Sequence, residues 1–168
     1  PRGSHIYTNL HSPEREHCYR DILHSATEHD VKAIVICIHF PDRTNCAWAM
    51  DDCVMYLFER LCMQLNGRES SGIIVCDQPG GGRSEDVAFL ERFLEHLRSG
   101  TEYIKQCERI ALNVLTTPSN FLRQLQLADL AVGITTAMVC GNAKFAGPLF
   151  PIIQQMLIVG NGGRIGGS

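Results

Sequence analysis

The sequence predicts a single α/β domain in which parallel strands are flanked by helices. The chain has 168 residues, of which 45% are hydrophobic, and this suits one globular domain with a substantial core. Segments with helical periodicity alternate with short, continuous, β-branched apolar runs. No internal repeat or linker divides the chain. Alternation of this kind favours parallel strands with helices packed on the faces of the sheet.

The first half of the chain predicts a helix, a strand and a second helix. Ser12-Pro13 begins the first helix, because serine is a good N-cap and proline fits the first helical position; the helix ends near His29-Asp30. The β-branched run 31–39 (VKAIVICIH) predicts a buried strand. Residues 47–65 predict the clearest helix, with Gly67 as its C-cap. Its apolar stripe comprises Met50, Val54, Leu57, Phe58, Leu61 and Leu65.

The centre of the chain predicts strand, helix and strand again. Residues 72–77 (GIIVCD) form a buried strand that ends in Asp77. Ser84 caps the next helix and Gly100 ends it. The stripe of that helix comprises Val87, Leu90, Phe93, Leu94 and Leu97. Residues 109–115 (RIALNVL) predict the third strand, and Thr116-Thr117-Pro118 turns the chain.

Two helical segments complete the prediction. Ser119 or Asn120 caps a long helix that runs to about Val139. Its apolar residues are Leu122, Leu125, Leu127, Leu130 and Val132. Residues 149–159 form a final apolar helix, which packs on its own domain or on a second copy of the chain. We therefore keep a homo-oligomer as an open expectation.

Composition narrows the class of protein. A net charge of −3 and a pI of about 6.2 give no strong basic field for nucleic acid, so a nucleic-acid partner would need a local patch. The eight cysteines contain no C-x-x-C pair, and several lie in apolar runs, which favours reduced thiols in the cytoplasm. No apolar run is long enough to span a membrane.

The predicted domain covers residues 6–159, and the two ends of the sequence lie outside it. Residues 1–5 resemble the remnant of a cleaved purification tag. Residues 160–168 form a glycine-rich tail that we expect to be flexible.

Two aspartates are the candidate catalytic residues. Asp77 ends a buried strand, and ligands of open α/β sheets gather at the carboxyl ends of strands. Asp129 lies in an apolar helix, where a buried carboxylate needs a metal or an arginine as partner. Both aspartates also have an ordinary interpretation, as a helix cap and as a solvated residue. The loop PGGGRSED, with Arg83, joins a strand to a helix N-terminus and offers a third candidate site, for phosphate.

These residues resemble a known family. The strand IIVCD, an amphipathic helix, a strand, a Pro-Ser turn and the hexapeptide LQLADL (125–130) resemble the family called domain of unknown function 3800, over about residues 13–140. The resemblance implies a ribonuclease-H-like mixed sheet flanked by helices. It also implies that Asp77 and Asp129 are catalytic residues that bind Mg²⁺ or Mn²⁺. Arg83, Ser119 and Asn120 would then line the channel for a nucleic-acid substrate.

One feature of that family is absent from this sequence. The family opens with a strand that carries Asp-Glu-Ser-Gly, whereas this sequence begins with the tag-like residues and Ile6. We expect that an N-terminal strand is missing from this sequence. Three hypotheses follow: a metal-dependent nuclease or related phosphoryl-transfer enzyme, a non-catalytic interaction module of the same fold, or a nucleotide-binding protein that uses PGGGRSE. Asp51, Asp52 and Glu59 are further acidic candidates, although we expect Glu59 to pair locally with a cation.

Overall fold

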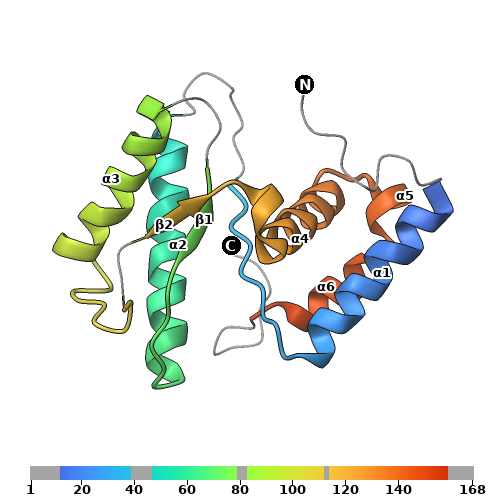
Figure 1. Cartoon of the computed structure of the whole chain (residues 1–168), viewed down its shortest axis with the longest axis horizontal. Coiled ribbons are helices and arrows are strands. Elements are labelled where there is room, and N and C mark those ends of the chain that lie inside the picture. Colours follow the sequence, from blue (N-terminus) through green and yellow to red (C-terminus); the bar gives the residue numbers. More distant parts are fainter. Residues whose placement is uncertain (1–11, 39–46, 79–82, 112–113, 159–168) are drawn as a thin grey trace. The chain divides into compact units, whose positions relative to one another are not determined.

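The computed structural model describes residues 12–38, 47–78, 83–111 and 114–158. They form two compact units: one holds the described residues up to Val35 and from Gln126 onward, and the other runs from Ile36 to Leu125. Helices dominate both units, and two short parallel strands lie in the second (Figure 1). The mixed α/β class is therefore confirmed. The ribonuclease-H-like arrangement and the single-domain organisation stay predictions.

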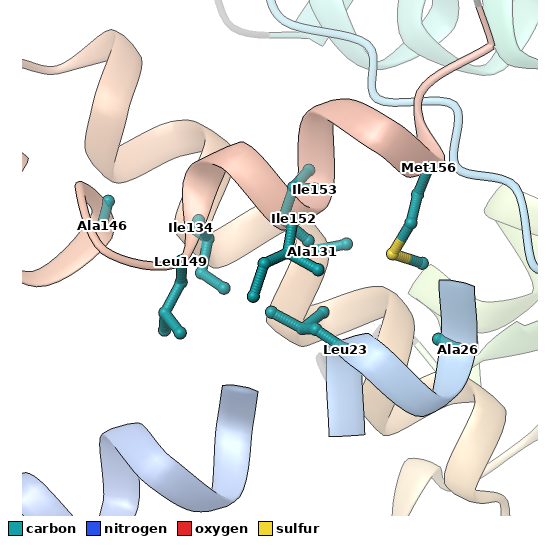
Figure 2. Close-up of a cluster of buried hydrophobic side chains, with 9 residues drawn as sticks. All are labelled: Leu23, Ala26, Ala131, Ile134, Ala146, Leu149, Ile152, Ile153 and Met156. Atoms are coloured by element: carbon teal, nitrogen blue, oxygen red, sulfur yellow. The ribbon is translucent and has the colours of Figure 1, made fainter. Parts of the chain in front are cut away.

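The first unit is built from α1 (Ser12–Glu28), most of α4 (Arg123–Val139), α5 (Ala143–Ala146) and α6 (Phe150–Met156). Its core is an aliphatic cluster to which α1, α4 and α6 each contribute, and Figure 2 shows Leu23 of α1 pointing toward Ile152 of α6. The cluster comprises Leu23, Ala26, Ala131, Ile134, Ala146, Leu149, Ile152, Ile153 and Met156. The C-terminal apolar segment 149–159 therefore packs within its own chain, because four of its residues are buried in this cluster.

The prediction of a strand at residues 31–39 is wrong for its described part. Residues 31–38 form no strand, and His39 lies outside the described residues. A single parallel bridge joins Ala33 to Leu157: the Ala33 amide donates to the Met156 carbonyl at 2.8 Å, and the Ile158 amide donates to the Ala33 carbonyl at 3.1 Å. A β-branched run favours a strand, but a ladder also needs a partner strand.

The second unit contains α2 (Ala47–Gly67), β1 (Val75–Asp77), α3 (Arg83–Ser99), β2 (Leu115–Thr117) and the 3₁₀ helix η2 (Ser119–Phe121). Helices α2 and α3 lie side by side (Figure 1), and Arg92 of α3 forms an ion pair with Asp51 of α2. The core comprises Val54, Phe58, Cys62, Phe93, Ile104, Cys107 and Val114. Phe58 and Phe93 meet edge-to-face at its centre, with ring centroids 5.9 Å apart.

Most helix ranges agree closely with the predictions, but the buried faces are shifted. The long helix expected to begin after a Ser119 or Asn120 cap is an exception: those residues form η2, and α4 begins at Arg123. On α2 the fully buried stripe is Val54, Phe58 and Cys62, spaced four residues apart. Val87 of α3 and Val132 of α4 were placed on apolar stripes, and both are exposed instead.

The sheet is smaller than predicted, but its strands are parallel as expected. Val75 pairs with Leu115 and Asp77 with Thr117, and α3 forms the crossover between the strands. The predicted strand 72–77 is reduced to its last three residues, with an isolated bridge from Gly72 to Ile110. The third strand lies later in the chain than predicted, so two threonines placed in a turn belong to β2.

The prediction of reduced thiols is wrong for two cysteines. Cys62 of α2 and Cys107 form a disulfide, and their Cα atoms are 5.8 Å apart. Both residues lie in the core of the second unit. Among the described residues, the free cysteines are Cys18, Cys37, Cys53, Cys76 and Cys140. The cytoplasmic location stays a prediction.

Candidate functional site

Asp77 lies at the carboxyl end of β1, where the sequence placed it. Its Oδ1 atom accepts a hydrogen bond of 2.7 Å from the backbone amide of Ser119, the first residue of η2. This bond connects the ends of two adjacent parallel strands, because only Pro118 separates Ser119 from the last residue of β2. Each carboxylate oxygen has two lone pairs, so the amide leaves Asp77 with capacity to bind a cation or a substrate group.

The two faces of the sheet differ in what covers them. Ile74 and Cys76 pack against the core between α2 and α3, so the alternate residues Ile73 and Asp77 belong to the opposite face. Ile73 is 56% exposed, and Leu115, on the same face of β2, is 48% exposed. Asp77 itself is partly buried. The carboxylate therefore stands at the edge of an apolar face rather than inside the core.

Asp129 differs from its prediction. It was expected to be an acid enclosed by leucines in an apolar helix, but its side chain is exposed on α4. The buried residues of α4 are Ala131, Ile134 and Thr135. An exposed carboxylate is hydrated, so the expected need for a metal or an arginine to offset burial does not arise. Asp129 belongs to the first unit and Asp77 to the second.

The other predicted site residues are only partly described. Helix α3 begins at Arg83, and the Arg83 side chain and the glycines 80–82 lie outside the described residues. Ser119 supplies its amide to Asp77, and Asn120 beside it is exposed. The structure thus brings Ser119 and Asp77 together at one end of the sheet. The phosphate-binding interpretation of PGGGRSE stays a prediction.

Glu59 is a residue whose environment the sequence analysis misjudged. It is only 6% exposed on α2, and the hydroxyl of Thr101 donates to its Oε1 atom at 2.5 Å. The expected local pairing with a cation is therefore replaced by a hydrogen bond from a residue 42 positions away. The sequence did contain a signal for the burial of Glu59. This residue lies one turn before Cys62, beside the apolar stripe of α2.

Burial raises the pKa of two thiols in the second unit. Burial raises the pKa of Cys76 above its ordinary value of 9.0. Burial also raises the pKa of Cys53, with smaller contributions from the negative charges of Asp52 and Cys37. Both thiols are therefore held protonated at neutral pH, which does not favour a nucleophilic role.

A complete metal centre is not assembled by the part of the chain that the structure describes. No group of three or more His, Cys, Asp or Glu side chains lies close enough there to hold an ion. Asp77 is a suitable single ligand, since its oxygens are the hard donors that Mg²⁺ and Mn²⁺ prefer. Any such centre would need Asp77 to be joined by further ligands.

Comparisons with known proteins assign neither a family nor a function to this chain. The chain matches no family model, no curated protein and no solved structure. Within the described ranges, no helix is long and apolar enough to cross a membrane.

Proposed function

We propose that this chain is a metal-dependent nuclease, or a related phosphoryl-transfer enzyme, with a ribonuclease-H-like fold. The observation that carries the proposal is the position of Asp77. It ends a parallel strand in a strand–helix–strand unit and faces away from the core between α2 and α3. Catalytic carboxylates and ligands of α/β folds gather at this edge of the sheet. The family resemblance of residues 13–140 supports the same reading.

In this proposal Asp77 and Asp129 are each a candidate ligand of Mg²⁺ or Mn²⁺, and a bound ion would lower the pKa of a water and stabilise the leaving oxygen of a phosphodiester. The Ser119 amide fixes the orientation of the Asp77 carboxylate through its 2.7 Å bond to Oδ1. Fixing a carboxylate in advance lowers the cost of orienting it when substrate arrives. Ser119, Asn120 and Arg83 are the residues proposed to contact the nucleic acid.

A second candidate is a non-catalytic interaction module of the same fold. The hydrogen bond from Ser119 to Asp77 also favours this alternative, because an aspartate that caps a helix has a sufficient structural role without catalysis. The two candidates differ in what the negative charge of Asp77 does. A cap needs only an acceptor oxygen, whereas a metal ligand needs the charged carboxylate.

The test separates those two properties with three variants. Asp77→Asn keeps an acceptor for the Ser119 amide and removes the charge, whereas Asp77→Ala removes both. Glu102→Gln is the matched control, because Glu102 is an exposed acid in the same unit that has no role in the proposal. Labelled single-stranded RNA, single-stranded DNA, duplex DNA and an RNA–DNA hybrid are incubated with Mn²⁺, Mg²⁺ or chelator.

The nuclease proposal expects metal-dependent cleavage of at least one substrate. Asp77→Asn should reduce that cleavage at least about 100-fold while its melting temperature stays near that of the parent chain. Glu102→Gln should cleave normally. Absence of cleavage by the parent chain with every substrate and metal would favour the interaction module, as would Asp77→Asn that cleaves like the parent.

A further inference from the structure

Two interactions connect helix α2 to the segment that follows α3. Glu59 and Cys62 lie three residues apart on α2. Glu59 accepts a hydrogen bond from the Thr101 hydroxyl, and Cys62 forms the disulfide with Cys107. The segment from Thr101 to Cys107 folds back on itself at its start, because the Thr101 amide donates a hydrogen bond of 2.7 Å to the Ile104 carbonyl. One link is a hydrogen bond, and the other is a covalent bond that thiols can open.

The same segment leads directly into the sheet. The Gly72 amide donates to the Arg109 carbonyl, and the Ala111 amide donates to the Gly72 carbonyl, both at 2.8 Å. A few residues later the chain enters β2, which pairs with β1 and positions the Ser119 amide on Asp77. The disulfide therefore anchors one end of the segment that carries β2. Opening the disulfide leaves β2 held by its strand pairing and core contacts.

The two cysteines of the disulfide differ slightly in exposure. Cys62 is completely buried, and Cys107 is 9% exposed. Both neighbours of Cys107, together with Arg109, line an open polar hollow of about 610 Å³. Its lining residues are Asn66, Ser71, Gln106, Glu108 and Arg109. The Arg109 guanidinium in this lining attracts the carboxylate groups of a small polar thiol, whereas the Glu108 carboxylate repels them.

We propose that the Cys62–Cys107 disulfide is a redox-sensitive link that controls the mobility of residues 107–111 and of β2. A thiolate of the glutathione type attacks Sγ of Cys107, forms a mixed disulfide with it and displaces Cys62 as a thiolate, which is then protonated. A second thiol attacks the mixed disulfide and releases Cys107. The protein gains two S–H groups, and two molecules of thiol are oxidised to one disulfide.

Reduction releases the segment without dissolving the unit. The Phe58–Phe93 contact and the ion pair between Arg92 and Asp51 join α2 to α3 independently of the disulfide. A free cysteine packs as a small hydrophobic residue, so Cys62 keeps its place in the core after reduction. The expected difference is local: β2 and the residues before it open more often, whereas α2 and α3 stay protected.

The experiment uses the full chain and does not depend on catalysis, so its outcome is separate from that of the nuclease proposal. The untreated protein is alkylated, digested and analysed by mass spectrometry, and the Cys62 and Cys107 peptides should appear linked. After treatment with millimolar glutathione both should be alkylated. Amide exchange in residues 110–111 and 114–117 should then speed up by at least roughly tenfold more than exchange in α2 does.

A pair of variants tests the route of attack. Arg109→Gln should slow reduction by glutathione several-fold, but not reduction by the uncharged 2-mercaptoethanol. Arg98→Gln, which changes an exposed arginine near the end of α3 away from the hollow, should leave both rates unchanged.

Three results would overturn the proposal. The first is that Cys62 and Cys107 are free in the untreated protein. The second is a disulfide that glutathione opens only under unfolding conditions. The third is complete reduction after which exchange in residues 110–111 and 114–117 speeds up no more than exchange in α2. Equal effects of Arg109→Gln and Arg98→Gln would overturn the assignment of the hollow as the route of attack.

Discussion

Opening the Cys62–Cys107 disulfide should lower the free energy of unfolding of the second unit by about 4 kcal/mol. The two cysteines are 45 residues apart, and the chain-entropy relation for a loop of that length gives about 4 kcal/mol at 25 °C. The loop encloses β1 and α3, so the restriction acts on much of the unfolded unit. Reduction leaves both side chains in place, so the value contains no cavity term.

The assay is urea unfolding of the oxidised and the reduced chain. The single tryptophan, Trp48, lies in α2 and reports on the second unit. With a denaturant slope of about 2 kcal/mol per molar urea, the midpoint should fall by about 2 M on reduction. Cys140→Ala is the control, because Cys140 is an exposed free thiol in the first unit and its removal should leave the midpoint unchanged. A decrease below about 1 kcal/mol would refute the reasoning, because the loop would then restrict the unfolded chain far less than its length implies.

Two further predictions concern the same unit. Gly100 has φ of +71°, and a Cβ there would lie 2.5 Å from the Lys105 carbonyl oxygen, so Gly100→Ala should destabilise the unit by more than about 1 kcal/mol in thermal unfolding. The matched Gly67→Ala, which has open space in α2, should be neutral or stabilising, and similar effects of the two variants would contradict this account. Burial raises the pKa of Cys76 above 9.0, so alkylation of Cys76 near pH 8 should be much slower than that of the exposed Cys140, with equal rates in denaturant. Because the folded state holds this proton more tightly, its contribution to stability is present below pH 9 and is lost as the pH rises through the raised pKa; equal labelling of both thiols in the folded chain would contradict the prediction.

Local signals in the sequence predicted the helices well. Ser12-Pro13 marks the start of α1, and Gly100, with its positive φ, follows the last residue of α3. The final apolar segment was also recognised as helical and forms α6. Capping residues and apolar periodicity act within a few residues of chain, so such features can be predicted without knowledge of the tertiary contacts.

Pairing between segments that are distant in the sequence was predicted less well. The run 31–39 has strong β propensity, yet its described part makes one bridge through Ala33, because a strand requires a partner that propensity does not specify. The central role of Cys62 was also missed, since an apolar cysteine is equally compatible with a free thiol and a disulfide.

The candidate site was predicted in part for the same reason. The strand-end position of Asp77 followed from the apolar run before it, and the structure adds that the Ser119 amide binds it. The burial expected for Asp129 was wrong, because the buried face of α4 is formed by Ala131 and Ile134 instead of the leucines around the aspartate. A small residue such as Ala131 gives only a weak indication that it is buried when leucines surround it in the sequence.

The most direct test of the proposed function is calorimetric titration of Mn²⁺ into the parent chain, Asp77→Asn, Asp129→Asn and the control Glu102→Gln. If each aspartate is a metal ligand, its variant should weaken Mn²⁺ binding at least about tenfold, whereas Glu102→Gln should bind Mn²⁺ like the parent chain. Absence of Mn²⁺ binding by the parent chain, or parent-like binding by Asp77→Asn, would contradict the proposed metal site.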